Sequence, residues 1–145
     1  MLYQDLSLSL YTNSRLFIQF IQNYLNEFGL TYPQYLVLSI LWKEDGILVK
    51  QIGEKMHLDS GTLTPLIKKL EGMNYVKRQR GEADERTVHV ELTYPGKSLQ
   101  TKITQALIPL ENQLNELDHL NLADLNNSLQ NLLESIQSLK NSKQG

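Results

Sequence analysis

A helix, a turn and two strands are encoded in residues 58–92, LDSGTLTPLIKKLEGMNYVKRQRGEADERTVHVEL. In the first half of this stretch, apolar residues recur every three or four positions from Leu63 to Leu70, which is the spacing of one helix face. Asp59 or Ser60 can accept hydrogen bonds from the free N–H groups at the start of this helix. The first half therefore predicts a helix with a capped N-terminus.

The second half of the same stretch predicts a β hairpin. Residues 75–80 have the character of a short strand, and residues 81–85 are polar and contain a glycine. Residues 87–92 alternate between polar and apolar, which places three side chains on one face, Val88, Val90 and Leu92. Two short strands around a charged loop, directly after a helix, form the wing of a winged helix-turn-helix.

Further helices are predicted on both sides of this stretch. Helical patterns occur at residues 6–28, 33–44, 50–56, 99–117 and 125–139. Pro33 disfavours helix at Tyr32, so it separates the first two of these segments. The leucines and isoleucine of the last segment are spaced four, three, four and three residues apart, which is a heptad seam.

The order of these elements predicts one mainly α chain, 1–145, with a small β hairpin. Residues 33–92 are expected to form a winged helix-turn-helix region with its own core. Residues 1–32 and 93–145 are expected to supply flanking dimerisation helices, because their apolar stripes are too long for this small core to cover. We therefore expect a homodimer in which these helices bury one another.

Composition narrows the range of functions. The chain has 145 residues, a formal net charge of −2 and no cysteine, which excludes disulfides, cysteine-ligated zinc and a thiol nucleophile. No apolar run approaches the roughly 20 residues of a membrane span, and no basic segment precedes an apolar one as in a secretory signal. We therefore expect a cytoplasmic protein that does not contact the membrane. Residues 68–80 hold five basic side chains and one acid, and a globally acidic protein with such a local basic patch can still bind a phosphate backbone.

Three blocks of sequence carry a resemblance to a known family. They are Leu30-Thr31-Tyr32-Pro33-Gln34-Tyr35, then Leu58-Asp59-Ser60-Gly61-Thr62-Leu63-Thr64-Pro65-Leu66, and then Asp84-Glu85-Arg86 before Val88 and Leu92-Thr93. With these blocks in this order, the chain resembles the MarR family of bacterial transcription regulators, and within it the organic-hydroperoxide repressor branch and its staphylococcal global-regulator relatives. The resemblance implies a homodimer on a pseudo-palindromic operator of double-stranded DNA. It also implies that the helix starting near Ser60 enters the major groove and that the hairpin wing reaches the neighbouring minor groove.

The residue types on the predicted helix and wing suit these roles. Small hydroxyls at a helix start can contact bases or phosphates, and lysines one to two turns later suit phosphates. The resemblance implies that Asp84 orients Arg86, whose guanidinium enters the minor groove, since a narrow groove attracts arginine. The expected DNA-binding residues are Ser60, Gly61, Thr62, Thr64, Pro65, Lys68, Lys69, Arg78, Arg80, Asp84 and Arg86. The structural alternatives are capping and packing for the hydroxyls, a loop ion pair for Arg86, and solvated strand positions for the two arginines before the wing.

A departure from the family pattern falls near the N-terminus. Thiol sensors of this branch carry a reactive cysteine where this chain has Ser7, and a serine hydroxyl does not follow the oxidation chemistry of a thiol. The chain as given therefore cannot sense oxidants through a thiol. Ser7 fits either a natural variant or an engineered replacement, and Ile21, which stands where the family has a third tyrosine, favours the natural variant. The remaining aromatic residues fit core packing, which is the commoner role at helical spacing, and the alternative is a small-molecule effector pocket. The lining of such a pocket would be Ser7, Tyr11, Phe17, Tyr32 and Trp42.

Two other classes of protein compete with this interpretation. An enzyme is disfavoured because His57, His89 and His119 are far apart and the chain has no metal-binding or nucleophile motif. We expect no catalytic residue, no metal and no cofactor. The second alternative is a winged-helix module that binds only protein. Such a module has no need of lysines and arginines on both the helix and the wing, so these residues favour a DNA-binding regulator, with repression as the expected effect.

Overall fold

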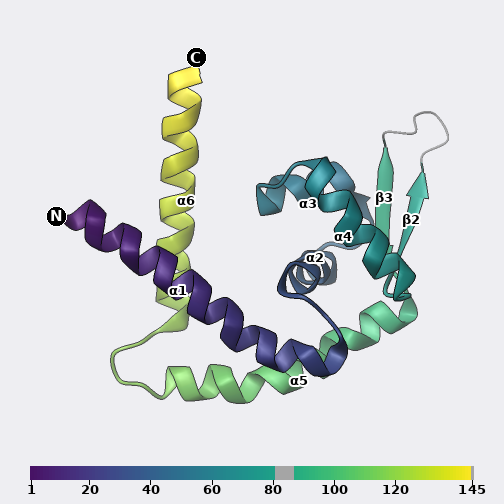
Figure 1. Ribbon diagram of the computed structural model, residues 1–145, viewed down its shortest axis with the longest axis horizontal. Helices are drawn as coiled ribbons and strands as arrows, with labels where there is room; N and C mark the ends of the chain where they lie inside the picture. The colour runs from purple at the N-terminus through teal and green to yellow at the C-terminus, as the bar shows by residue number, and fades with distance from the viewer. Residues whose placement is uncertain (81–86, 145) are drawn as a thin grey trace. The chain divides into compact units, whose positions relative to one another are not determined.

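The computed structural model describes residues 1–80 and 87–144, and it divides into two compact units, Met1–Ala106 and Leu107–Gly145. The first unit holds α1 (Leu2–Leu25), η1 (Asn26–Phe28), α2 (Tyr32–Lys43), β1 (Ile47–Leu48), α3 (Val49–Met56), α4 (Ser60–Gly72), β2 (Val76–Arg80), β3 (Val88–Leu92) and the start of α5 (Tyr94–Asn115) (Figure 1). The second unit holds the end of α5 and α6 (Leu122–Gln144). The predicted fold class, mainly α with a small β hairpin, is confirmed.

The hairpin belongs to an antiparallel sheet with the strand order β1-β3-β2. β2 and β3 are the two predicted strands, paired so that Val76 lies opposite Leu92. β1 is a two-residue strand that pairs Ile47 with Val90. The sequence alone did not indicate this pairing. Asp45 strengthens this edge, because its Oδ1 accepts the N–H of Leu92 at 2.8 Å.

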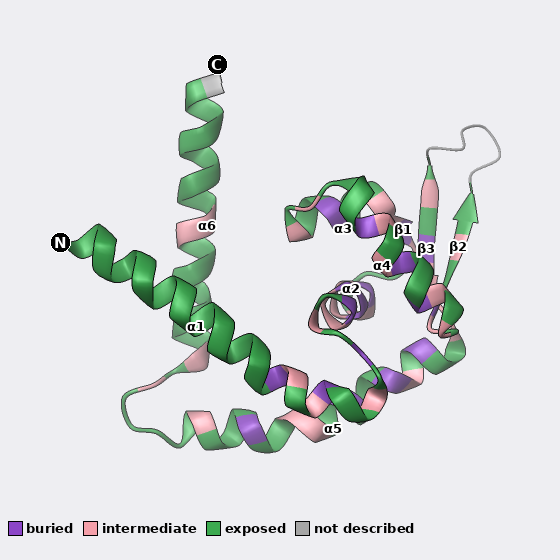
Figure 2. Cartoon of the chain, viewed as in Figure 1, coloured by how far each residue is buried: buried purple, intermediate pink, exposed green. Residues whose placement is uncertain are grey.

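The core of the first unit lies between α2, α3, α4 and the sheet. Its buried side chains include Val37, Leu38, Leu41, Ile52, Leu63, Ile67, Leu70, Val76 and Val90 (Figure 2). They come from the helical and alternating patterns of the sequence, and burying each large one stabilises the fold by roughly 1.5–3 kcal/mol. This packing fixes the buried face of α4, so the opposite face of the helix is left to solvent.

Side chains cap the starts of the helices that surround this core. The hydroxyl of Thr31 accepts the N–H of Gln34 at 3.3 Å, and the side chain of Gln34 accepts the N–H of Thr31 at 3.0 Å. This reciprocal pair is a capping box, and it starts α2 just before Pro33. At α4, Oδ1 of Asp59 accepts the N–H of Thr62 at 2.7 Å. Asp59 is therefore the cap, and Ser60 is the first residue of the helix.

The N-terminal helix begins and ends earlier than its apolar pattern suggested, and it is buried only near its end. The pattern predicts helix over residues 6–28, whereas α1 ends at Leu25 and a 3₁₀ turn continues to Phe28. Gly29 then adopts a φ of 68°, a left-handed conformation that glycine takes at little cost and that turns the chain toward α2. Within α1 only Ile21 and Leu25 are buried.

Candidate nucleic-acid interface

The first turn of α4 presents small polar groups to solvent. Ser60, Gly61 and Thr62 are exposed, and Thr64 is half-buried. The backbone N–H and the side chain of Thr62 both bond to the Asp59 carboxylate, and these bonds hold the pKa of Asp59 below its usual value. The turn is therefore anchored from within the chain, while its exposed hydroxyls stay in a position from which they can contact base edges or phosphates.

Positive charge follows on the same helix. Lys68 and Lys69 are exposed, as is Pro65 before them. Ammonium groups on long flexible stems suit phosphate contacts, which depend on charge rather than on a fixed geometry. Of the predicted DNA-binding residues on α4, the structure exposes all but Thr64.

The two arginines before the wing tip occupy different environments. Arg80 ends β2 and is exposed. The side chain of Arg78 is 26% exposed, and its Nη2 lies 3.1 Å from Oε1 of Glu71 in an ion pair. The sequence singled out Arg78 as a DNA contact and missed Glu71. The available signal was that Glu71 is the only acid among the basic residues 68–80.

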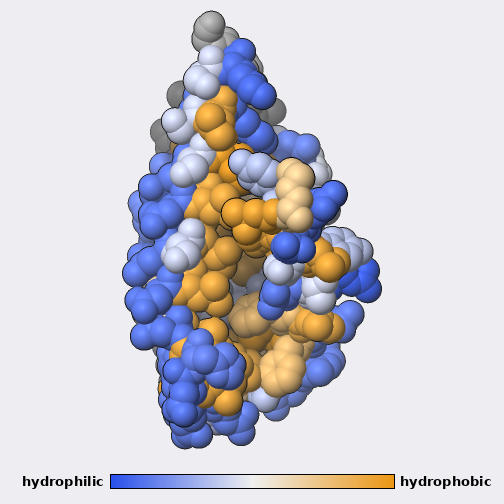
Figure 3. Space-filling view, turned by 90° about the vertical axis from the view of Figure 1, so that its left-hand side faces the viewer, coloured by the Kyte–Doolittle hydropathy of each residue, from blue (hydrophilic) through white to orange (hydrophobic). Residues whose placement is uncertain are grey.

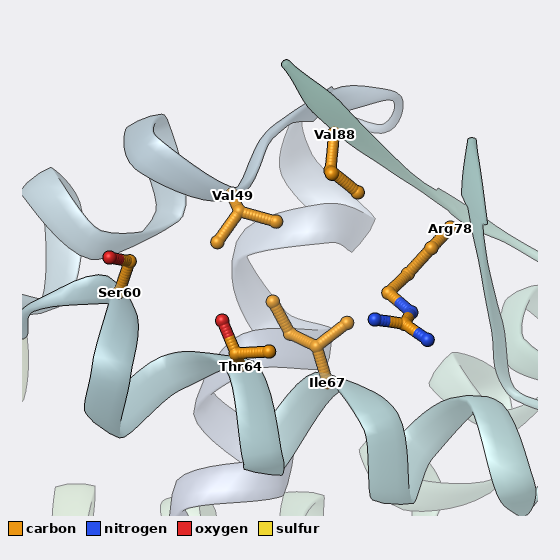
Figure 4. Close-up of a pocket in the computed structure, with 6 residues that line it drawn as sticks. All are labelled: Val49, Ser60, Thr64, Ile67, Arg78 and Val88. Carbon is orange, nitrogen blue, oxygen red and sulfur yellow. The ribbon is translucent and has the colours of Figure 1, made fainter. Parts of the chain in front are cut away.

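Arg78 also spans a hollow of about 130 Å³ between α3, α4 and the hairpin. Figure 4 shows Ser60, Thr64 and Ile67 projecting from α4 into this space and Arg78 reaching toward the same helix from its strand. Two apolar side chains complete the lining, Val49 and Val88. The guanidinium of Arg78 therefore lies against α4 instead of extending freely from the hairpin.

The wing tip carries Asp84 and Arg86, which lie outside the described residues. The last pair in register before the tip is Arg80 opposite Val88. The hairpin strands that lead to and from the tip are therefore placed, and the roles of Asp84 and Arg86 stay predictions.

The residues of the expected effector pocket fall into two groups. The rings of Tyr32 and Tyr35 are 6.1 Å apart, and those of Tyr35 and Trp42 are 6.3 Å apart. Burial, and to a lesser extent the neighbouring Tyr35, raises the pKa of Tyr32 above its usual value. The indole N–H of Trp42 donates to the carbonyl of Gly96 at 3.0 Å, so part of this aromatic cluster ties α2 to α5.

The other group lies on the exposed part of α1. Ser7 donates its hydroxyl to the carbonyl of Tyr3 at 2.6 Å. Tyr11 accepts a hydrogen bond from Arg15 at 3.0 Å, and Phe17 is 50% exposed. The structure therefore brings Tyr32 and Trp42 close through Tyr35 and places the other expected lining residues on a solvent-exposed helix surface.

Both units carry exposed apolar faces. In the first unit, α1 exposes a series of large side chains, Leu2, Leu6, Leu8, Leu10, Leu16, Phe17, Ile18 and Phe20. In the second unit, α6 exposes the predicted heptad seam, with Leu125, Leu129, Ile136 and Leu139 between 43% and 65% exposed. Figure 3 shows a band of exposed hydrophobic side chains along α6. None of the described helices is long and apolar enough to cross a membrane.

Comparisons with known proteins match this arrangement. The sequence profile of the family described as transcriptional regulator SarA/Rot matches residues 19–105. The HTH-type transcriptional regulator SarZ of Staphylococcus aureus (strain USA300) is 38% identical over 123 residues, which are 85% of this chain and 82% of SarZ. The structure of reduced AbfR bound to DNA has 34% identity and a TM-score of 0.82, over 95% of this chain and 94% of that one; AbfR has also been solved from Staphylococcus epidermidis. A MarR transcriptional regulator from Methanosarcina mazei Go1 has 26% identity and a TM-score of 0.81, over 94% of this chain and 99% of that one.

The fold and the exposed helix start define a winged-helix, DNA-binding transcription regulator, as the sequence predicted. The profile match covers more than half of the chain, and the identity to SarZ extends over most of it. The chain belongs to the SarA/Rot family of transcriptional regulators. The predicted resemblance to MarR regulators is confirmed at the level of the fold and the structural neighbours.

Proposed function

We propose that the protein is a homodimeric repressor that binds a pseudo-palindromic operator, with α4 of each protomer in a major groove. The observation that carries this proposal is the capped first turn of α4, where Ser60 and Thr62 are exposed. In helix-turn-helix proteins, the N-terminal residues of the second helix contact base edges. Lys68 and Lys69, exposed on the same helix, would contact phosphates on either side of the groove.

The hairpin supplies a second contact in this proposal. Arg86, oriented by Asp84, enters the minor groove next to the one that α4 occupies, and Arg80 contacts the backbone. Narrow, A·T-rich minor grooves concentrate negative potential, so the dimer prefers operators with A·T-rich flanks. The similarity to AbfR, whose reduced form has been solved bound to DNA, supports a DNA complex of this kind.

The dimer is formed by the flanking helices. The apolar faces of α1 and α6 are exposed in the single chain, and an exposed apolar surface of this extent on a protein in water marks an interface. A symmetric dimer covers both faces with copies of themselves. Its two α4 helices then meet half-sites about one helical turn apart, on the order of 34 Å.

The signal that controls this repressor is not oxidation of a thiol. The chain resembles the organic-hydroperoxide branch but has no cysteine, and Ser7 stands at the sensing position. A small apolar or phenolic effector that binds next to Tyr32 and Trp42 is the proposed signal in its place. The similarity to known transcription regulators supports a protein that works in the cytoplasm, where its operator DNA lies.

DNA binding is tested by fluorescence anisotropy with the DNA upstream of the protein's own gene and a scrambled duplex of equal composition. We expect a preference for the natural sequence and an affinity that falls steeply with salt. Lys69→Gln should weaken binding to both duplexes and reduce the salt slope by about one for each phosphate that the lysine no longer neutralises. Lys102→Gln removes the same charge from an exposed position on α5 and should change neither. Equal affinity for the two duplexes would refute the proposal.

Dimerisation is tested by sedimentation velocity, in which the wild type should sediment with twice the 16.7 kDa mass of the chain. Leu129→Glu places a charge in the apolar face of α6 and should shift the equilibrium toward monomer. Gln130→Glu adds the same charge at the next, exposed position and should leave the dimer intact. A wild-type monomer at micromolar concentration would contradict the proposed dimer.

A further inference from the structure

One carboxylate joins the end of α4 to the first strand of the wing. Glu71 is the second-last residue of α4, and its Oε2 accepts the backbone N–H of Arg78 at 2.9 Å. Its Oε1 accepts hydrogen bonds from Nε and Nη2 of the same arginine at 3.2 and 3.1 Å. Glu71 therefore holds both the main chain and the guanidinium of Arg78.

The bonds from Glu71 to Arg78 act further along β2 than the backbone bonds of the turn between α4 and β2. Within the turn, the N–H of Asn74 donates to the carbonyl of Glu71 at 2.9 Å, and the N–H of Tyr75 donates to the carbonyl of Leu70 at 3.0 Å. These backbone bonds hold the chain where β2 begins. The Glu71 carboxylate acts three residues beyond Tyr75, so it restrains the direction in which the hairpin leaves the helix.

The pair is also partly shielded from water. The side chain of Arg78 is 26% exposed and that of Glu71 is 35% exposed. Hydrogen bonds between ionised groups are stronger than neutral ones, and partial burial reduces their screening by salt. The hydrogen bonds from Arg78, first from its backbone and then from its side chain, hold the pKa of Glu71 below its usual value. The carboxylate is therefore charged, and its bonds are formed, at neutral pH.

We propose that Glu71 is a positioning residue for DNA recognition, which sets the placement of the wing strands relative to α4 by holding Arg78. This inference rests on the proposed function, because it requires that α4 and the wing contact DNA together. Simultaneous binding in two grooves depends on the angle between the two binding elements, and fixing that angle in advance lowers the cost of binding. Arg78 then serves as the partner of Glu71 and makes no phosphate contact.

Whether DNA affinity rises or falls when the charge of Glu71 is removed distinguishes a positioning role from simple electrostatics. Glu71 is the one acid among the basic residues 68–80, so its charge alone opposes phosphate binding nearby. If charge were its whole influence, removing the acid would raise the affinity for every duplex. If Glu71 positions the wing, the same change lowers the affinity for the operator, where both elements must fit at once.

The experiment compares operator and scrambled duplex by anisotropy for the wild type, Glu71→Gln and Glu71→Asp. Glutamine keeps the shape of the side chain and loses its charge, while aspartate keeps the charge and shortens its reach. We expect both variants to lower the ratio of operator to scrambled affinity by roughly tenfold, equivalent to about 1.4 kcal/mol. Glu91→Gln is the matched control, because Glu91 bonds within the hairpin, to Gln79 at 3.2 Å, and does not connect it to α4.

A double-mutant cycle shows whether Glu71 acts through Arg78. Arg78→Gln should lower the ratio as much as Glu71→Gln does, the double variant should lower it no further, and the salt slope should stay that of the wild type. A reduced salt slope in Arg78→Gln would show a phosphate contact and overturn the inference. An unchanged or increased ratio of operator to scrambled affinity in Glu71→Gln, measured when the wild type prefers its operator, would also overturn the inference. If the wild type shows no preference, the proposed function fails, and the inference fails with it.

Discussion

Replacing Gly96 by alanine tests how tightly the base of the hairpin, at Tyr75 just before β2, is packed against the start of α5. Gly96 is buried in the first turn of α5, where an added Cβ would overlap the backbone carbonyl oxygen of Tyr75. That oxygen already accepts the N–H of Thr93 at 3.1 Å. The carbonyl of Gly96 itself accepts the indole N–H of Trp42 at 3.0 Å. An extra methyl group must therefore push α5 away from the base of the hairpin and from α2.

The size of the effect follows from these contacts. Overpacking a well-packed site typically costs about 1–3 kcal/mol, and each of the two hydrogen bonds that would be strained contributes about 0.5–1.5 kcal/mol. The better helix propensity of alanine offsets about 1 kcal/mol. We expect Gly96→Ala to lower the free energy of unfolding by about 2–3 kcal/mol. In a chain of this size the melting temperature should then fall by about 5–10 °C.

Thermal unfolding followed by circular dichroism measures this effect, and Gly72→Ala is its control. A Cβ at Gly72, the last residue of α4, would meet nothing within 4 Å beyond its chain neighbours and the backbone of its own helix. Alanine at this helical position should leave the melting temperature unchanged or raise it slightly, since it reduces the entropy of the unfolded chain. A Gly96→Ala protein that melts at or above the wild-type temperature would refute the close packing of Gly96 against Tyr75.

Three other outcomes are expected. Arg86→Ala should lower operator affinity by well over tenfold, because each protomer gives up an interaction worth about 1–3 kcal/mol. The melting temperature should stay nearly unchanged, and normal operator affinity in this variant would remove Arg86 from the proposed interface. The pKa of Glu71 is lowered from its ordinary value of 4.5 by its bonds to Arg78, so this pairing stabilises the fold at pH values above 4.5. The stabilisation is lost as the pH falls below 4.5 and through the lower pKa of the folded state. Urea unfolding at a series of pH values should therefore show a smaller loss of stability on acidification in Glu71→Gln than in the wild type, and parallel curves would contradict the pairing. Organic hydroperoxide should leave DNA binding by this cysteine-free chain unchanged, whereas Ser7→Cys should make binding at least partly peroxide-sensitive. Anisotropy before and after treatment measures both, and an insensitive Ser7→Cys protein would show that a thiol at position 7 is not coupled to α4.

Local patterns in the sequence predicted most of the secondary structure. The start of α2 at Thr31 and the start of α4 at Asp59 depend on side chains that bond to backbone groups three residues away. The apolar stripes depend on spacings of three and four residues. The exposed polar residues of α4 could be recognised in the same way, because they occupy the face of an amphipathic helix that the core leaves free. Bonds and spacings over three or four residues can be recognised from a short stretch of sequence without knowledge of the rest of the fold.

Contacts between distant segments arose only in the tertiary structure. Asp45 bonds to Leu92 across 47 positions, and Trp42 bonds to Gly96 across 54. No periodicity in the sequence indicates which polar groups will meet in this way, because each pair is set by how α2, the sheet and α5 pack. The same holds for β1, whose pairing with β3 requires the two segments to be brought together by the core.

Glu71 and Arg78 show the difference most clearly, because they are only seven residues apart. The charge pattern indicated Arg78 as one of several basic residues available to phosphate. The chain reverses direction between the end of α4 and β2, and this reversal lays the strand beside the helix and brings the guanidinium to the carboxylate. The sequence contained both charges and the turn. Only the packing of the buried faces of α4 and the hairpin, which no local pattern specifies, brought the two charges within reach of each other.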